Sequence, residues 1–221
     1  MKKIITTLVI AVFVSIGHSQ DNTKTRFAVL GGINFQNLNG KNYLGEKLDN
    51  KMIVGFHLGA NADIPLADEF YFRPGLLFTT KGAKAENNNV TNTLRVSYLE
   101  MPLNFVYKGA LGSGFVMLGF GPYIAYGIKG KSKVENNGTT NTSDVRFKNE
   151  VETTDPQDKA YMKPFDAGAN IFAGYEFGGG MFFQLNTQLG LLNISPEYKS
   201  LSNDKSMVKN TGFGLSAGYR F

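Results

Sequence analysis

Hydrophobic and polar residues alternate along most of this chain, and the last stretch shows the pattern most clearly. From Thr211 to Phe221 the odd-numbered positions are mostly apolar, and the even-numbered ones are small or charged. A repeat of two residues indicates a β-strand, because successive side chains of a strand point to opposite faces of its sheet. In a soluble sandwich the apolar face would meet a core. In a membrane barrel it would meet lipid, and the small or polar face would line the lumen.

The same alternation predicts strands at residues 25–36, 51–63, 69–81, 93–108, 115–128, 164–177, 181–194 and 208–221. The connections between them alternate in length. Long polar loops are expected at residues 37–50, 82–92, 129–163 and 195–207, and tight turns elsewhere. Outer-membrane barrels have this asymmetry, with short periplasmic turns and long outer loops.

Outward-facing aromatic residues gather near the short-turn ends of the predicted strands. They are Phe27, Phe70, Phe72, Phe105, Tyr107, Tyr175, Phe177, Phe183, Tyr219 and Phe221. A ring of aromatic side chains at one level is typical of a membrane interface, whereas a soluble lipocalin-like barrel has no need of one. The predicted fold class is therefore all-β, an eight-stranded antiparallel up-and-down transmembrane β-barrel.

The first twenty residues have the pattern of a secretory signal peptide. Lys2 and Lys3 precede an apolar run at residues 4–16, and small or polar residues follow up to an expected cleavage near Ser19 or Gln20. The apolar run is too short to cross a bilayer as a helix. We therefore predict a signal peptide at residues 1–20, an outer-membrane barrel at residues 21–221, and export to the cell outer membrane.

Composition narrows the classes of protein. Removal of Lys2 and Lys3 lowers the formal charge from +5 to +3, which is too mild to indicate nucleic-acid binding. The absence of cysteine excludes disulfides and thiolate metal sites. The mean hydropathy of −0.17 is compatible with a barrel, because only every second residue of its strands meets lipid.

No constellation in the sequence predicts an enzyme, a cofactor site or a metal site. His57 is the one histidine after the signal peptide, and we find no serine and acid placed to complete a catalytic triad with it. Lysines interleave the acids of the longest loop, which favours a solvated loop over a calcium site. These acids are Asp144, Glu150, Glu152, Asp155 and Asp158.

Charged residues on the inward faces of the strands predict a polar network in the lumen. Arg73 and Glu100 lie on neighbouring predicted strands and both face inward. A narrow lumen cannot leave either charge without a partner, because desolvation would be costly. The predicted network contains Arg73, Lys81, Glu100, Asp166 and Glu176, and we interpret it as a plug of paired side chains rather than a substrate path.

Several short motifs, taken together in their order, resemble a known family. They are Phe72-Arg73-Pro74-Gly75-Leu76 with Lys81-Gly82, Tyr98-Leu99-Glu100-Met101-Pro102-Leu103, Gly121-Pro122-Tyr123, Asp166-Ala167-Gly168 and Gly218-Tyr219-Arg220-Phe221. Across nearly the whole mature chain the sequence resembles the PorT-type outer-membrane β-barrel family of Bacteroidetes. The resemblance implies a small outer-membrane barrel but no single activity. The family's namesake is linked to protein secretion and gliding machinery.

The sequence leaves three classes of function open. The preferred hypothesis is a non-enzymatic barrel that anchors an assembly or binds a protein or surface ligand through the loop at residues 129–163. A channel for small solutes is the alternative, and a membrane enzyme is the third. The expected partners are outer-membrane lipid and, during biogenesis, the barrel-assembly machinery, because the final strand with Tyr219 and Phe221 resembles the terminal strand that this machinery recognises.

Overall fold

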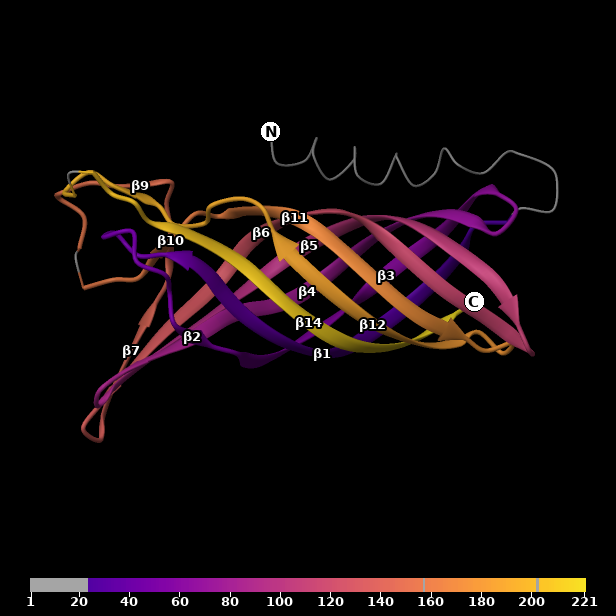
Figure 1. The fold of residues 1–221 in the computed structure, drawn as a ribbon, viewed down its shortest axis with the longest axis horizontal. Helices are drawn as coiled ribbons and strands as arrows, with labels where there is room; N and C mark the ends of the chain where they lie inside the picture. The colour runs from indigo at the N-terminus through magenta and orange to yellow at the C-terminus, as the bar shows by residue number, and fades with distance from the viewer. Residues whose placement is uncertain (1–23, 157, 202) are drawn as a thin grey trace, which may run out of the picture.

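A computed structural model describes residues 24–156, 158–201 and 203–221, and its main element is a closed antiparallel β-sheet (Figure 1). The predicted signal peptide lies outside the described residues. The ring strands are β1 (Arg26–Lys41), β3 (Ile53–Ala67), β4 (Phe70–Asn87), β5 (Val90–Leu111), β6 (Gly114–Asn136), β11 (Phe165–Glu176), β12 (Met181–Gly190) and β14 (Met207–Arg220). Neighbours in the chain are neighbours in the sheet, and β14 returns to β1. The predicted eight-stranded up-and-down barrel is confirmed.

The ring closes through a long seam between its first and last strands. The register of β1 and β14 runs from Ala28 opposite Arg220 to Lys41 opposite Met207. Each ring strand consequently has a partner on both sides. This arrangement suits a lipid environment, because hydrocarbon offers an open sheet edge no hydrogen-bond partner.

The polarity of the barrel is inverted relative to that of a soluble protein. On the outside, Phe120 and Ile171 are 63% and 65% exposed. On the inside, Lys81 and Arg220 are each 1% exposed. Alternation therefore serves to place apolar side chains outward, as it does in a barrel surrounded by lipid. Among the described residues, no helix is long and apolar enough to cross a membrane.

Aromatic side chains contact one another around the short-turn end of the barrel, which is the end that holds the C-terminus in Figure 1. Phe70 packs on Tyr107 with ring centroids 5.4 Å apart, and Phe177 meets the edge of Phe183 at 6.3 Å. Such contacts between neighbouring strands stabilise the sheet, and their common level is typical of an interfacial girdle.

At the opposite end β1, β4, β5 and β6 extend beyond the predicted strands, whereas β12 ends at Gly190, short of the predicted residue 194. The expected loop at residues 82–92 is wrong, because β4 and β5 continue as a hairpin that turns at Asn88 and Asn89. Similarly, β6 continues to Asn136 and turns through Asn137-Gly138 into β7 (Thr139–Asp144). Both turn residues have positive φ, as a two-residue hairpin of the Asn-Gly type requires. Beyond the lipid both faces of a strand meet water, so no apolar alternation marks these extensions.

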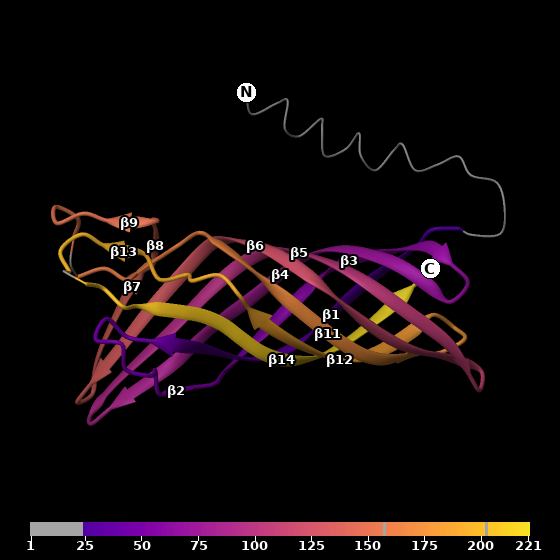
Figure 2. The same cartoon turned by 45° about the horizontal axis from the view of Figure 1, so that its top comes forward.

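The predicted loop at residues 129–163 also contains short strands. Within it, β8 (Arg146–Phe147) pairs with β10 (Tyr161–Met162), and β9 (Glu150–Val151) pairs with β13 (Glu197–Tyr198) of the next loop. A further short strand, β2 (Asn50–Lys51), lies outside this loop and pairs with β4. Figure 2 shows β8, β9 and β13 at the same end as β7, away from the C-terminus. Two-residue ladders carry no periodicity, which explains why the sequence pattern did not indicate them.

Apolar residues of these outer segments close the mouth of the lumen. Val145, Met162 and Ile194 are buried in one cluster with the inward-facing Tyr98 and Tyr123 of β5 and β6. Both backbone groups of Ile194 are hydrogen-bonded. Its carbonyl accepts from the N–H of Lys163 at 2.9 Å, and its N–H donates to the carbonyl of Val208 at 2.8 Å. The outer end of the barrel is therefore covered by packed side chains.

The inverted polarity predicts the effect of a charge on the outer face. Ile171→Arg places a guanidinium where the structure exposes an apolar side chain, and arginine near the middle of a bilayer costs roughly 2–4 kcal/mol in such barrels. We expect that loss in the free energy of unfolding, measured by urea titration in lipid vesicles. Thr140→Arg on β7, outside the apolar band, is the control and should be neutral. Equal stability of the two variants would contradict the assignment of faces.

Candidate functional site in the lumen

A cluster of charged side chains fills the lumen near the short-turn end. Asp63 receives hydrogen bonds from the Arg73 guanidinium, with Nη2 to Oδ2 at 3.0 Å, and from Lys108 Nζ at 3.1 Å. Lys108 Nζ also reaches Glu176 Oε2 at 2.7 Å, and Arg220 Nε reaches the same oxygen at 3.0 Å. The two carboxylates are thus held by three buried cations, and removal of either carboxylate would leave desolvated positive charge.

The extra positive charge of this lower cluster faces aromatic rings. Arg73 lies 5.3 Å from the ring centroid of Phe172, and Arg220 lies 5.4 Å from that of Phe182. Lys108 lies 5.3 Å from the ring centroid of Tyr71. The face of an aromatic ring carries partial negative charge, so these rings help to stabilise a cluster that holds one more cation than carboxylates.

A second cluster lies nearer the outer end and has the opposite balance of charge. Lys81 Nζ is 2.7 Å from Glu100 Oε2 and 3.3 Å from Asp166 Oδ2. Neutral groups donate further hydrogen bonds to the two acids. Asn210 Nδ2 and the Tyr123 hydroxyl donate to Asp166 Oδ2 at 2.9 and 3.2 Å, and Gln188 Nε2 donates to Glu100 at 2.6 Å. One buried lysine therefore serves two buried carboxylates, while Asp166 Oδ1 has no hydrogen-bond partner among the described residues.

The structure divides the five residues of the predicted network between these two clusters. Arg73 and Glu176 lie in the lower cluster, and Lys81, Glu100 and Asp166 lie in the upper one. Arg73 and Glu100 lie on the neighbouring strands β4 and β5, as predicted, but have different partners. Sequence reasoning did not include Asp63, Lys108 and Arg220, although alternation places all three on inward faces. Asp63 meets Arg73 on the adjoining strand, whereas Lys108 and Arg220 reach Glu176 from strands that are not its neighbours, which alternation along one strand does not report.

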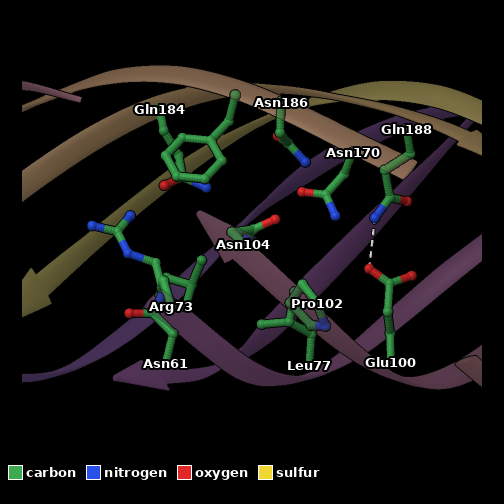
Figure 3. A pocket seen from close by; sticks show the side chains of 12 residues that line it. Asn61, Arg73, Leu77, Glu100, Pro102, Asn104, Asn170, Gln184, Asn186 and Gln188 are labelled. Atoms are coloured by element: carbon green, nitrogen blue, oxygen red, sulfur yellow. Dashed lines mark hydrogen bonds between the residues drawn. The ribbon is translucent and has the colours of Figure 1, made fainter. Parts of the chain in front are cut away.

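A small cavity separates the two clusters. Its volume is about 40 Å³, and Figure 3 shows Arg73 and Glu100 at its opposite sides. Amide side chains make up most of the polar lining, namely Asn61, Asn104, Asn170, Gln184, Asn186 and Gln188. The space suffices for a few water molecules but not for a solute the size of a sugar or an amino acid. The lumen therefore contains a polar chamber rather than a passage.

The histidine of the lumen has partners that the sequence did not indicate. Ser216 Oγ lies 2.7 Å from His57 Nε2, and Asn34 Oδ1 lies 2.6 Å from His57 Nδ1. The sequence offered no serine and acid to complete a triad with His57; the structure places a serine beside the imidazole, and the third group is the amide of Asn34 rather than an acid. Ser216 comes from β14, which meets β1 and β3 only after the barrel has closed. From the sequence alone, Ser216 belonged to a row of small residues on the last strand and had no other assigned role.

This arrangement resembles a nucleophile, a base and an orienting amide, but its surroundings indicate a structural role. His57 and Ser216 are 5% and 4% exposed, and neither lines the lumen cavity. Asn34 is itself held by Thr79, with Nδ2 to Oγ1 at 3.0 Å. Gly32 leaves room for the imidazole, because a Cβ there would lie 2.7 Å from His57 Cε1. A substrate has no route to Ser216 in this packing.

The two residues of the predicted assembly signal lie on the outside at the short-turn end. Tyr219 and Phe221 are 51% and 66% exposed. The backbone N–H of Phe221 donates to the carbonyl of Phe27 at 2.9 Å. The end of the described chain is thus paired with the first ring strand, while both aromatic side chains face outward.

Comparison with known proteins agrees with this architecture. A family model described as outer membrane protein beta-barrel domain matches residues 18–195. The chain belongs to this family. It is accordingly an outer-membrane β-barrel protein. A search of curated proteins found no match.

Solved structures similar to this outer-membrane barrel come from distant sequences. Ail, the attachment invasion locus protein of Yersinia pestis, is 15% identical with a TM-score of 0.38, and the match covers 89% of this chain and 99% of Ail. Neisserial surface protein A is 14% identical with a TM-score of 0.41, and the match covers 88% of this chain and 95% of that one.

The upper cluster predicts a large effect when its cation is removed. Lys81→Met leaves Glu100 and Asp166 buried without a cation, and breaking such a group costs about 3–5 kcal/mol. We expect that decrease in the free energy of unfolding in lipid vesicles. The triple variant Lys81→Met, Glu100→Gln, Asp166→Asn removes the charges together and should recover most of the loss. A single variant as stable as the wild type would contradict the assigned ion pairs.

Proposed function

We propose that this protein is a non-enzymatic, non-conducting outer-membrane barrel that binds a protein partner through the sheet extending beyond its outer end. The observation that carries the proposal is the edge of β7. In the described residues β7 pairs with β6 alone, so its other side is open. An exposed edge is a template for a strand supplied by another chain.

The alternation of hydrogen-bonded and non-bonded residue pairs between β6 and β7 tells which backbone groups of β7 point away from β6. The N–H of Val145 donates to the carbonyl of Gly130 at 2.9 Å, and bonded pairs in an antiparallel ladder recur at every second residue. By this alternation Thr140, Thr142 and Asp144 direct their backbone groups away from β6. Neither lysine nor proline, which commonly protect exposed edges, occurs within β7. The edge is therefore able to pair with an extended segment.

The packed lumen supports an anchor or binding role over a channel. Two charged clusters and an outer apolar cluster occupy the interior, and the cavity between the clusters measures only about 40 Å³. An eight-stranded barrel has an interior just wide enough for side chains to fill. The buried position of His57 and Ser216 likewise supports the absence of an enzymatic role, which hydrolysis of lipid or peptide esters by refolded protein would overturn.

Planar-bilayer recording tests the packed lumen directly. We expect no steady conductance at the nanosiemens scale from refolded protein, because paired ions and side chains leave no continuous water-filled passage. A variant lacking lumen bulk, Phe172→Ala with Phe182→Ala, serves as the control that checks incorporation and sensitivity. A steady open level in the wild type would favour the alternative function, transport of small solutes.

The partner edge is tested by blocking it without altering the hairpin. Thr142→Pro removes an N–H that points away from β6, and proline is tolerated on edge strands. Thr142→Ala keeps the N–H and is the matched control. Crosslinking on intact cells should capture a partner with the wild type and with Thr142→Ala, and lose it with Thr142→Pro. Equal capture by all three proteins would refute pairing at this edge.

We also propose that Tyr219 and Phe221 act as the signal that the barrel-assembly machinery recognises. Their exposure on the terminal strand supports this role. Deletion of Phe221 should lower the amount of folded protein in the outer membrane of cells, measured by heat-modified mobility on gels. Phe177→Ala, which removes an exposed aromatic residue from the same end, is the control. Normal insertion without Phe221 would refute the signal.

We also propose that the protein is a member of the PorT-type family and that it contacts a secretion machinery. The PorT-type motifs favour a connection to a secretion machinery, and a partner that adds a strand to β7 would provide the physical link. Identification of the crosslinked partner decides the matter. Capture of a secretion component would support the link, and capture of an unrelated surface protein would remove it.

A further inference from the structure

A β-bulge between β5 and β6 marks the level where the strands leave the apolar band. Ser97 pairs with Lys129 and Tyr98 pairs with Gly127, so Ile128 is an extra residue on β6. An extra residue reverses the facing of the side chains beyond it. Before the bulge the even-numbered side chains of β6 point outward. After it the odd-numbered ones do, and these include Lys129, Lys131 and Lys133.

Two of these lysines stand side by side on one face of β6. Lys129 and Lys131 are two residues apart and both face outward, so their charges repel. Within the part of the chain that the structure describes, neither of them makes an ion pair. Arg95 lies opposite Lys131 in the register of β5 and β6, but its guanidinium extends the other way, across β4, and donates to the carbonyl of Val54 on β3 at 2.6 Å.

The carboxylates on this face do not neutralise the cluster. Glu135 is paired with Lys133 at 2.7 Å, and Glu86 is paired with Lys84 at 2.6 Å. Asp144 lies opposite Lys131 on β7, beyond ion-pair distance. One carboxylate therefore lies beside two cations, Lys129 and Lys131, that lack an ion-pair partner. An anion at this position would relieve the repulsion between them.

The residues directly below the cluster identify the kind of anion. Ile128, Tyr126 and Leu99 point outward and are 52%, 55% and 46% exposed. Apolar and aromatic side chains at this density belong in the membrane, with tyrosine at its interface. The cations immediately above them consequently lie at the level of lipid headgroups, where long basic side chains bind phosphate.

We propose that Lys129 and Lys131 form a binding site for the phosphate of an outer-leaflet lipid headgroup. The long hairpins place this end of the barrel on the outside of the membrane. The bulge creates the site, because it turns lysines outward that would otherwise enter the lumen. The acyl chains of the bound lipid would lie along the apolar residues below. The site is separate from the β7 edge, so it stands or fails independently of the partner proposed above.

The test compares lipids that differ in headgroup. Refolded protein is placed in mixed micelles containing phosphatidic acid, which carries a phosphate monoester, and phosphatidylcholine, and the retained lipids are counted by native mass spectrometry. The variant Lys129→Gln, Lys131→Gln removes charge without removing any ion pair, so it should fold. Lys47→Gln, Lys205→Gln makes the same change of charge in outer loops and is the matched control.

Basic residues near a membrane surface each contribute on the order of 1 kcal/mol toward anionic lipid, so loss of two should lower the preference for phosphatidic acid roughly thirtyfold. The loop control should keep the preference of the wild type. If both variants lost the preference for phosphatidic acid equally, the preference would depend on net charge alone, and the site would be overturned. Displacement of the lipid by inorganic phosphate or by a soluble sulfated polysaccharide at similar concentration would also overturn it, because the site would then recognise an anion rather than a lipid.

Discussion

The demand of the peptide backbone for hydrogen bonds in a medium without water determines this structure. Hydrocarbon provides no donor or acceptor, so the sheet must close on itself, and the seam between β1 and β14 accomplishes this. With eight strands, closure leaves an interior that side chains can fill. Once filled, the interior excludes bulk water, and each charge within it needs a partner from another strand. The ion pairs of the lumen are thus a consequence of the closed backbone.

Small residues make the paired interior possible. Three inward positions of β14 are glycine, namely Gly212, Gly214 and Gly218, and bulky groups of neighbouring strands use the space. A Cβ at Gly218 would lie 2.4 Å from the ring of Phe182, and that ring in turn supports Arg220. At the centre, Gly32 gives His57 its place beside Ser216. The glycines of this chain are therefore part of the charge arrangement as much as of the backbone.

The sequence predicted the membrane part well because one physical rule governs it throughout. Facing alternates with every residue and lipid accepts only apolar side chains, so Ile171 and Phe120 could be placed outward without a structure. Outside the membrane this rule ends, and the outer hairpins and short strands were missed. Inside the lumen, facing alone did not reveal partners. The pairing of His57 with Ser216 depends on barrel closure, which brings together residues far apart in the chain, and the pairing of Arg73 with Asp63 depends on the register of β3 against β4.

Glu176 joins the two ends of the closed ring. Arg26, at the start of β1, reaches one of its oxygens at 3.1 Å, and Arg220, at the end of β14, reaches the other at 3.0 Å. The carboxylate is fully compensated only when the first and last strands meet. A sheet that is assembled but not yet sealed would hold this acid short of partners in a nearly dry interior, an unfavourable state. Sealing the seam and neutralising the acid are consequently a single cooperative event, which disfavours half-open barrels during folding.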